Sequence, residues 1–160
     1  MGKIIFICGK ICSGKSMYTK KLLENMKAVV LSTDEILLSL SLRIPDSDEY
    51  DKIVSELQYY LFKKAEEIIS CGTTVIFDGG FGLKRDRESV SKHFSERSIR
   101  FEWHYIDISD EDWKENIKER NMLVREKKVQ AYYVDEGLLQ KMISKFEKPS
   151  KDAIDVWIAN

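Results

Sequence analysis

A run of eight residues near the start of the chain has the types and spacing that bind phosphate. The run matches the pattern G-x-x-x-x-G-K-[ST], known as Walker A, at every fixed position. Its residues are Gly9, Lys10, Ile11, Cys12, Ser13, Gly14, Lys15 and Ser16. Glycines let the backbone curl, so that successive N–H groups point at phosphate oxygens. We therefore predict that this phosphate loop, with Met17 after it, holds the phosphates of a nucleotide.

Two side chains of the loop have separate predicted roles. Lys15 would reach the β- and γ-phosphates, and the hydroxyl of Ser16 would ligate Mg²⁺. The alternative is a glycine-rich turn that binds nothing. However, the run lies between a buried strand and a helix, as a phosphate loop must. The unpaired N–H groups at the start of that helix also favour an anion.

Short apolar runs alternate with segments of helical periodicity along the chain. The sequence predicts strands over 3–8, 28–32, 73–77, 100–106 and 155–159. It predicts helices over 15–26, 47–70, 83–94, about 109–128, and from 135 to a stop at Pro149. Ser109 and Asp135 are the expected caps of the last two helices. Strands that alternate with helices predict an α/β fold, a parallel sheet with helices on both faces.

The composition fits an ordinary globular protein and limits the possible partners. Of the 160 residues, 43% are hydrophobic, and 26 basic side chains meet 27 acidic ones. This excludes a strongly basic protein that is drawn to nucleic acid or anionic lipid by long-range charge. The apolar runs are too short to span a bilayer, and no signal peptide is evident. We expect one domain over residues 1–160, in the cytoplasm, with three reduced cysteines.

The layout of the chain resembles a known family. Besides the loop, Ser32-Thr33-Asp34 follows the second expected strand and Asp78 ends the third. The chain is similar to small kinase-like P-loop proteins of the AAA-type ATP-binding domain family. That group is similar to phage polynucleotide kinase, the zeta toxins, chloramphenicol phosphotransferase, and the shikimate and gluconate kinases. The resemblance implies a three-layer P-loop NTPase fold whose five parallel strands have the order 2-3-1-4-5.

Asp34 is the expected catalytic carboxylate. The carboxyl ends of parallel strands open into the ligand crevice, and a carboxylate there can accept a proton from an attacking hydroxyl. The resemblance implies that Asp34 orients the acceptor and takes its proton. The alternative is that Asp34 only caps a helix that Glu35 begins.

Asp78 has two expected roles and one structural alternative. At the end of a strand it resembles a Walker B carboxylate, which holds Mg²⁺ through water. The following segment, through Arg85, resembles the Asp-Gly-Phe-Pro-Arg string of adenylate kinases, with an extra glycine and no proline. In that case Asp78 faces the acceptor. The alternative is a turn carboxylate beside two glycines.

Several arginines are candidates for binding negative charge on phosphate or acceptor. The resemblance implies a lid over about 118–134, from which Arg120 and Arg125 close on ATP and exclude water. A solvated helix face is the alternative reading of these two residues. Arg85, in a small basic cluster, and Arg43, after Asp34, are candidates for holding the acceptor.

Together these features predict an ATP- and Mg²⁺-dependent phosphotransferase that moves the γ-phosphate to a hydroxyl of a small molecule. A nucleoside, nucleotide or polynucleotide 5′-hydroxyl kinase is one alternative. Nucleic acid is not favoured, because the charge is balanced. The other alternative is a regulatory protein that binds ATP and transfers nothing.

Overall fold

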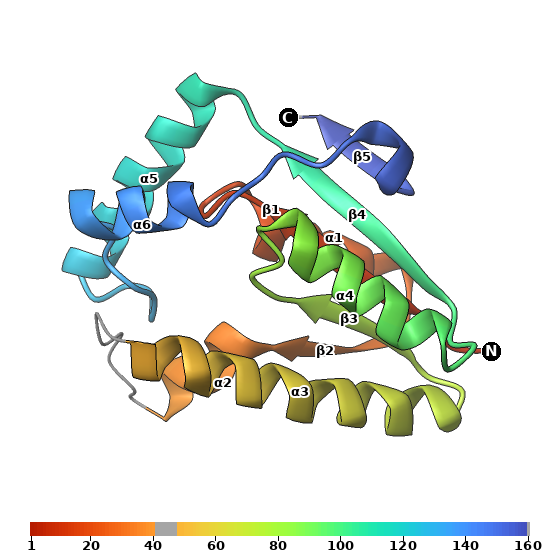
Figure 1. Cartoon of the computed structure of the whole chain (residues 1–160). Helices are drawn as coiled ribbons and strands as arrows, with labels where there is room; N and C mark the ends of the chain where they lie inside the picture. Colours follow the sequence, from red (N-terminus) through yellow and green to blue (C-terminus); the bar gives the residue numbers. More distant parts are fainter. Residues whose placement is uncertain (41–47, 160) are drawn as a thin grey trace.

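Five parallel strands form one sheet at the centre of the computed structural model, which describes residues 1–40 and 48–159 (Figure 1). The strands are β1 (Ile4–Gly9), β2 (Ala28–Ser32), β3 (Thr74–Asp78), β4 (Phe101–Asp107) and β5 (Val156–Ala159). Their order is β2-β3-β1-β4-β5. Both the predicted α/β fold and the predicted strand order are confirmed. This order places β1, which leads into the phosphate loop, between β3 and β4.

Helices cover both faces of the sheet. They are α1 (Lys15–Asn25), α2 (Thr33–Ser39), α3 (Asp48–Ser70), α4 (Lys84–Ser95), α5 (Asp110–Arg125) and α6 (Glu136–Ser144). A single 3-10 turn, η1 (Lys151–Ala153), precedes β5. No helix among the described residues is both long and apolar enough to cross a membrane.

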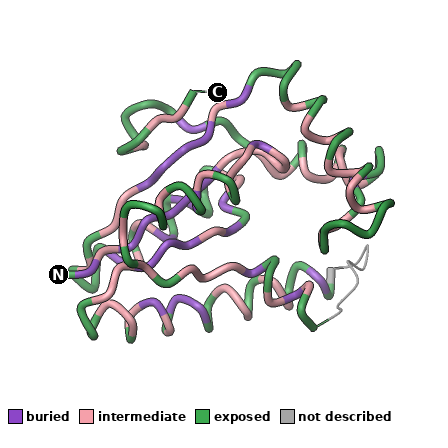
Figure 2. The backbone as a smooth tube through the Cα atoms, turned by 180° about the vertical axis from the view of Figure 1, so that it is seen from behind, coloured by how far each residue is buried: buried purple, intermediate pink, exposed green. Residues whose placement is uncertain are grey.

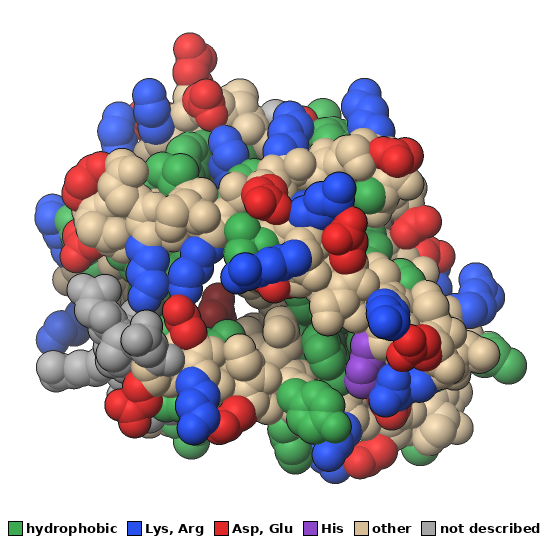
Figure 3. Space-filling model, viewed as in Figure 1, with side chains coloured by type: hydrophobic (Ala, Val, Ile, Leu, Met, Phe, Trp, Pro, Cys, Tyr) green, Lys and Arg blue, Asp and Glu red, His purple; other side chains and the backbone are tan. Residues whose placement is uncertain are grey.

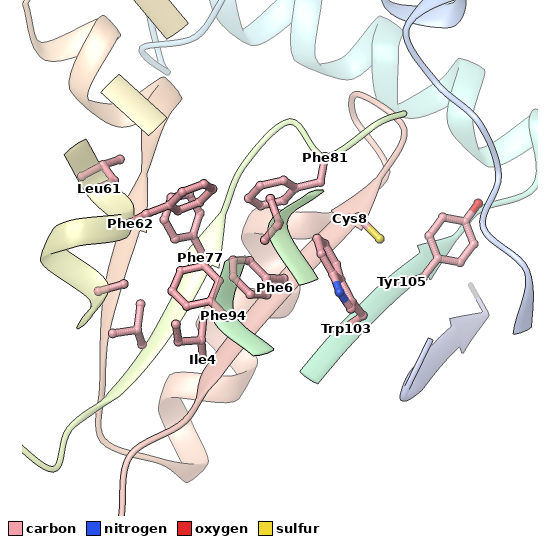
Figure 4. Close-up of a cluster of buried hydrophobic side chains, with 13 residues drawn as sticks. Ile4, Phe6, Cys8, Leu61, Phe62, Phe77, Phe81, Phe94, Trp103 and Tyr105 are labelled. Atoms are coloured by element: carbon pink, nitrogen blue, oxygen red, sulfur yellow. The ribbon is translucent and has the colours of Figure 1, made fainter. Parts of the chain in front are cut away.

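The core lies on both sides of β1, because successive side chains of a strand point to opposite faces. Phe6 packs with Phe77, Phe94 and Trp103 in an aromatic cluster on the face that α3 and α4 cover (Figure 4). On the opposite face, a smaller aliphatic cluster around Ile5 and Ile7 packs against α1. Figure 2 shows the buried residues concentrated in the central strands. Both faces of β1 are therefore fixed in a dry core, which holds the start of the phosphate loop rigidly.

Helix ends differ from the sequence predictions in specific places. Ser109 and Asp135 accept hydrogen bonds from backbone N–H groups and cap α5 and α6, as predicted. However, α6 ends at Ser144, so the prediction that Pro149 stops it was wrong. Likewise α5 ends at Arg125 rather than near residue 128, because the chain turns at Lys127 with φ of 56°. Arg43 lies outside the described residues.

Candidate nucleotide and acceptor site

The phosphate loop joins β1 to α1 through two glycines that the local geometry requires. A Cβ atom on Gly9 would lie 2.7 Å from the Ser13 hydroxyl and 3.0 Å from the carbonyl oxygen of Ile106 on β4. Gly14, the N-cap of α1, has φ of 97°, in the left-handed region that favours glycine. Cys12 also adopts positive φ, at 57°. The sequence therefore folds here into a tight, uncommon backbone path of the kind that surrounds a phosphate.

The amine of Lys15 lies inside this loop. It donates hydrogen bonds to the carbonyl oxygens of Gly9, at 3.1 Å, and Lys10, at 2.8 Å. Burial lowers the pKa of Lys15, while the negative charges of Asp78 and Asp34 oppose that shift. The predicted phosphate-binding cation is thus held by two weak carbonyl partners, with two carboxylates nearby.

Both predicted carboxylates lie at the same edge of the sheet as the loop. Asp78 pairs in register with Ile7 of β1 and with Ser32 of β2, so three strand ends meet there. Burial raises the pKa of Asp78; Lys15 lowers it, and Asp34 raises it further. The structure therefore brings Lys15, Asp34 and Asp78 together, as the sequence predicted.

The first turn of α2 shows whether Asp34 serves only as a helix cap. The Ser32 hydroxyl accepts the hydrogen bond from the backbone N–H of Glu35, at 3.2 Å, and caps this helix. Asp34 is therefore not the cap of α2, and its side chain is exposed. Ser16 and Met17 lie exposed at the start of α1, next to the loop.

The two predicted lid arginines point to different places. The Nη1 atom of Arg120 donates to the sulfur of Cys12 at 3.4 Å, so Arg120 touches the phosphate loop. Arg125 instead donates to the hydroxyl of Tyr133, and its guanidinium lies 4.9 Å from the centre of that ring. The structure thus joins Arg120 to the site and places Arg125 on a separate surface.

Two arginines that follow β3, Arg85 and Arg87, also lie in different surroundings. Arg85 is 82% exposed and lies 3.7 Å from Asp86. Arg87, by contrast, is buried and donates to the carbonyl oxygens of Phe81, Gly82 and Glu147. The structure therefore does not bring Arg85 to the loop, and Arg87 acts as a brace between the segment after Asp78 and the chain before β5.

Four side chains that the sequence did not assign to the site also belong to it. Trp113 and Asn116 of α5 donate to carbonyl oxygens of the phosphate loop. Tyr50 and Tyr132 lie near Asp34: burial raises the pKa of each phenol, and the charge of Asp34 raises it further. The Tyr132 hydroxyl is buried beside the hydroxyl of Tyr50, and each phenol shifts the pKa of the other. The spacing 113, 116, 120 was the available signal for the α5 contacts, since it marks one helix face.

The site opens into a hollow. Figure 3 shows it between α5 and α6 on one side and α2 and α3 on the other, with an acidic side chain at its floor. A separate pocket of about 570 Å³ borders the loop at the ends of β4 and β5. It is lined by Lys10, Tyr105, Asp107, Ile108, Ser109, Asp110, Phe146, Lys148 and Ala159. A nucleotide therefore has space beside the phosphate loop, next to Lys10.

The residues at the loop fit a nucleotide with Mg²⁺. The Ser13 hydroxyl and the Nε atom of Arg120 are buried with no hydrogen-bond partner among the described residues, and both lie at the loop. In the described ranges no cluster of three or more His, Cys, Asp or Glu side chains could enclose a metal. Mg²⁺ on a phosphate loop needs no such cage, since phosphate oxygens, water and one or two side chains complete its shell.

Comparison with known proteins agrees with this geometry. The profile of a family described as AAA domain matches residues 4–149. Protein KTI12 homolog of Arabidopsis thaliana is 25% identical over 151 residues, covering 92% of this chain and 48% of that relative. The chain thus spans about half the length of the curated relative it matches.

Solved structures share the whole fold at low sequence identity. The Mycobacterium tuberculosis APS kinase CysC, in complex with AMPPNP and APS, has a TM-score of 0.66 and 20% identity, covering 99% of this chain and 88% of that one. Chaetomium thermophilum Kti12, in complex with ADP-AlF3, has a TM-score of 0.61 and 12% identity, covering 98% and 88%. These likenesses establish a P-loop kinase fold. Because the family profile matches from residue 4 to residue 149, the chain belongs to the AAA domain family.

Proposed function

We propose that the chain is an ATP- and Mg²⁺-dependent phosphotransferase that moves the γ-phosphate of ATP to a hydroxyl of a small molecule. The observation that carries the proposal is the meeting of Lys15, Asp34 and Asp78 at one edge of the sheet. A phosphate-binding cation next to one exposed carboxylate, Asp34, and one largely buried carboxylate, Asp78, suits transfer, which needs one group for the nucleotide and another for the acceptor.

The residues divide into a nucleotide side and an acceptor side. On the nucleotide side, the loop N–H groups and Lys15 bind the phosphates, and Ser16 ligates Mg²⁺, with Asp78 facing that ion or the acceptor. When bound there, Mg²⁺ would reduce the negative charge of the phosphates. We propose that the pocket lined by Phe146 and Lys148 holds the base.

On the acceptor side, Asp34 orients the hydroxyl and accepts its proton as the new O–P bond forms. The bond between the γ-phosphorus and the β–γ bridging oxygen breaks, and ADP leaves with the electron pair. Arg120, already at the loop, stabilises the negative charge on the transferring group. Its half-buried side chain also helps to exclude water, which would otherwise compete with the acceptor.

Exchange of the Asp34 carboxylate tests the chemical step. Asp34→Asn keeps the shape of the side chain but cannot accept the proton, so we expect the transfer rate to fall ~10²-fold or more. The affinity for ATP is expected to change little. The neighbouring exposed carboxylate offers a matched control in Glu35→Gln. If Asp34→Asn transfers phosphate at the rate of the unchanged protein, the role of Asp34 is refuted.

A second function is favoured by one comparison. The curated relative is named as a KTI12 homolog and not as a kinase. An ATP-binding regulatory protein of this fold would bind or hydrolyse ATP without forming a phosphorylated acceptor. Nucleotide-dependent capture of a protein partner, with no labelled small product, would favour this function over transfer.

A further inference from the structure

One face of α5 is bound to the phosphate loop, although about a hundred residues separate the two in sequence. The indole Nε1 of Trp113 donates to the carbonyl oxygen of Ile11 at 2.6 Å. The Nδ2 atom of Asn116 donates to the carbonyl oxygen of Cys12 at 2.9 Å. Arg120, one turn further on, donates to the Cys12 sulfur. Residues at this spacing share one helix face, so α5 lies along the loop as a continuous support.

A side chain of the loop strengthens the same contact from the other direction. The Nζ atom of Lys10 lies 4.6 Å from the centre of the Trp113 ring and 3.2 Å from a carboxylate oxygen of Asp110. Three consecutive loop positions, from Lys10 to Cys12, are therefore each fixed to the first three turns of α5.

These contacts determine where the loop N–H groups point. A trans peptide directs its carbonyl oxygen and its N–H to opposite sides. Because α5 holds the carbonyl oxygens of Ile11 and Cys12, the N–H groups of Cys12 and Ser13 are turned away from α5. The N–H of Ser13 donates to the carbonyl oxygen of Lys10 at 3.2 Å and closes a turn of the loop, which leaves the N–H of Cys12 to face an anion. A loop without this support would relax, since Cys12 has positive φ without being glycine.

We infer that Trp113 and Asn116 are positioning residues, which hold the phosphate loop in its anion-binding conformation before the nucleotide arrives. The inference rests on the proposed nucleotide site and deepens it. Neither side chain needs to touch the nucleotide, because each acts through a carbonyl oxygen of the loop. The same helix face carries Arg120, so the support also sets the distance between the loop and this arginine.

Two conservative substitutions test the inference. Trp113→Phe removes the indole N–H but keeps a ring below Lys10, and Asn116→Ala removes the amide. Lys114→Ala, at an exposed position on the same helix, is the matched control, and Lys15→Ala is the reference for loss of the site. The affinity for ATP·Mg²⁺ is measured by calorimetry, and amide hydrogen exchange is measured over residues 9–14 in each protein without nucleotide.

We expect Trp113→Phe and Asn116→Ala each to weaken ATP·Mg²⁺ binding ~10-fold and to speed exchange of the loop amides. Lys114→Ala is expected to leave both unchanged. The melting temperature without nucleotide checks that each variant is folded. An unfolded Trp113→Phe is replaced by Trp113→Leu and an unfolded Asn116→Ala by Asn116→Leu, which also lack the donor and add no charge.

The outcomes separate the inference from the function on which it rests. If folded Trp113→Phe and Asn116→Ala proteins bind ATP·Mg²⁺ as tightly as the unchanged protein while Lys15→Ala does not, the positioning role is overturned and the nucleotide site stands. If Lys15→Ala itself binds ATP·Mg²⁺ normally, the nucleotide site is wrong and the inference falls with it.

Discussion

Arg120 rests on Cys12: its Nη1 atom lies 3.4 Å from the cysteine sulfur, which connects the middle of α5 to the phosphate loop 108 residues earlier. A thiol is a weak acceptor, and the Nε atom of the same arginine is buried with no partner among the described residues. A guanidinium so placed gains charge-assisted hydrogen bonds when it meets a phosphate instead. We therefore propose that Arg120 contacts the transferring group.

Removal of this guanidinium is expected to slow transfer far more than it weakens binding. For Arg120→Ala we predict a ~10³-fold lower turnover, because arginines of this kind stabilise the charge that develops during transfer. Arg125→Ala is the matched control, since Arg125 stacks on Tyr133 away from the loop. Single-turnover kinetics with saturating ATP measure both. A larger loss in Arg125→Ala than in Arg120→Ala would contradict this assignment.

The buried hydroxyl of Tyr132 is expected to contact the acceptor. Tyr132→Phe removes a hydroxyl that lies beside Tyr50 and near Asp34, and it keeps the ring. We predict a ~10-fold higher KM for the acceptor, with the KM for ATP unchanged, as expected for loss of one hydrogen bond. Tyr133→Phe serves as the control. Steady-state kinetics with each substrate varied in turn would refute the contact if both KM values stayed constant.

The ionised carboxylate of Asp78 is expected to lower the stability of the folded protein at neutral pH. Burial raises the pKa of its carboxyl, so between the unfolded and the folded pKa the folded state binds more protons, and stability falls as the pH rises through that window. Asp78→Asn should therefore raise the melting temperature at pH 7, by about 2–4 °C per kcal/mol gained, while reducing Mg²⁺-dependent transfer. The difference in melting temperature should shrink towards pH 4. An Asp78→Asn protein less stable than the unchanged chain at pH 7 would contradict the sign.

The buried His104 gives a separate pH dependence. Burial lowers the pKa of His104 below 6.5, although the Glu102 carboxylate, which accepts a hydrogen bond from its ring, opposes that shift. The Tyr18 hydroxyl lies 2.9 Å from its Nδ1 atom. The folded state then binds fewer protons than the unfolded state, so this stability is present above pH 6.5 and is lost as the pH falls through the lowered pKa. Urea unfolding from pH 7.5 to 5 should show a smaller loss of stability in His104→Gln than in the unchanged protein. His93→Gln, on the opposite face beside Phe62, should keep the full loss.

Arg87 and Arg85 form a matched pair for stability. The buried guanidinium of Arg87 donates to three carbonyl oxygens, so Arg87→Met should cost about 3 kcal/mol of unfolding free energy. Arg85→Met should cost less than about 0.5 kcal/mol, because that side chain is 82% exposed. Urea unfolding measures both. Kinetics of Arg85→Met also test whether Arg85 holds the acceptor, in which case the KM for the acceptor rises.

Sequence reasoning reached the parts of the site that local pattern determines. The phosphate loop is one contiguous segment, so its residue types are enough to identify it. Asp34 and Asp78 could be placed near it because parallel strands open into the ligand crevice at their carboxyl ends. The prediction that Arg120 and Arg125 both close on ATP overlooked the geometry of the helix. Five helical residues correspond to about 140° of rotation, so Arg120 and Arg125 could not both face the loop from one regular helix.

Other features depended on contacts between distant segments. Trp113 and Asn116 became part of the site only because α5 crosses the loop; their spacing marks one helix face but does not predict what that face contacts. Arg87 is buried by the segment before β5, although its neighbours in sequence are charged and exposed. Ser32, rather than Asp34, caps α2 because the strand ends one residue before the helix begins.

The central claim is that this loop delivers a γ-phosphate to a hydroxyl acceptor, and one measurement tests it most directly. ATP labelled in the γ-phosphate is incubated with Mg²⁺, the protein, and a pool of nucleosides, sugars, antibiotics and a 5′-hydroxyl oligonucleotide. Lys15→Ala is the test variant, and Lys20→Ala, at an exposed position on α1, is its control. The account predicts a labelled acceptor that forms with the unchanged protein and with Lys20→Ala but not with Lys15→Ala. Tight ATP binding with no labelled acceptor, or an equal yield from Lys15→Ala, would contradict it.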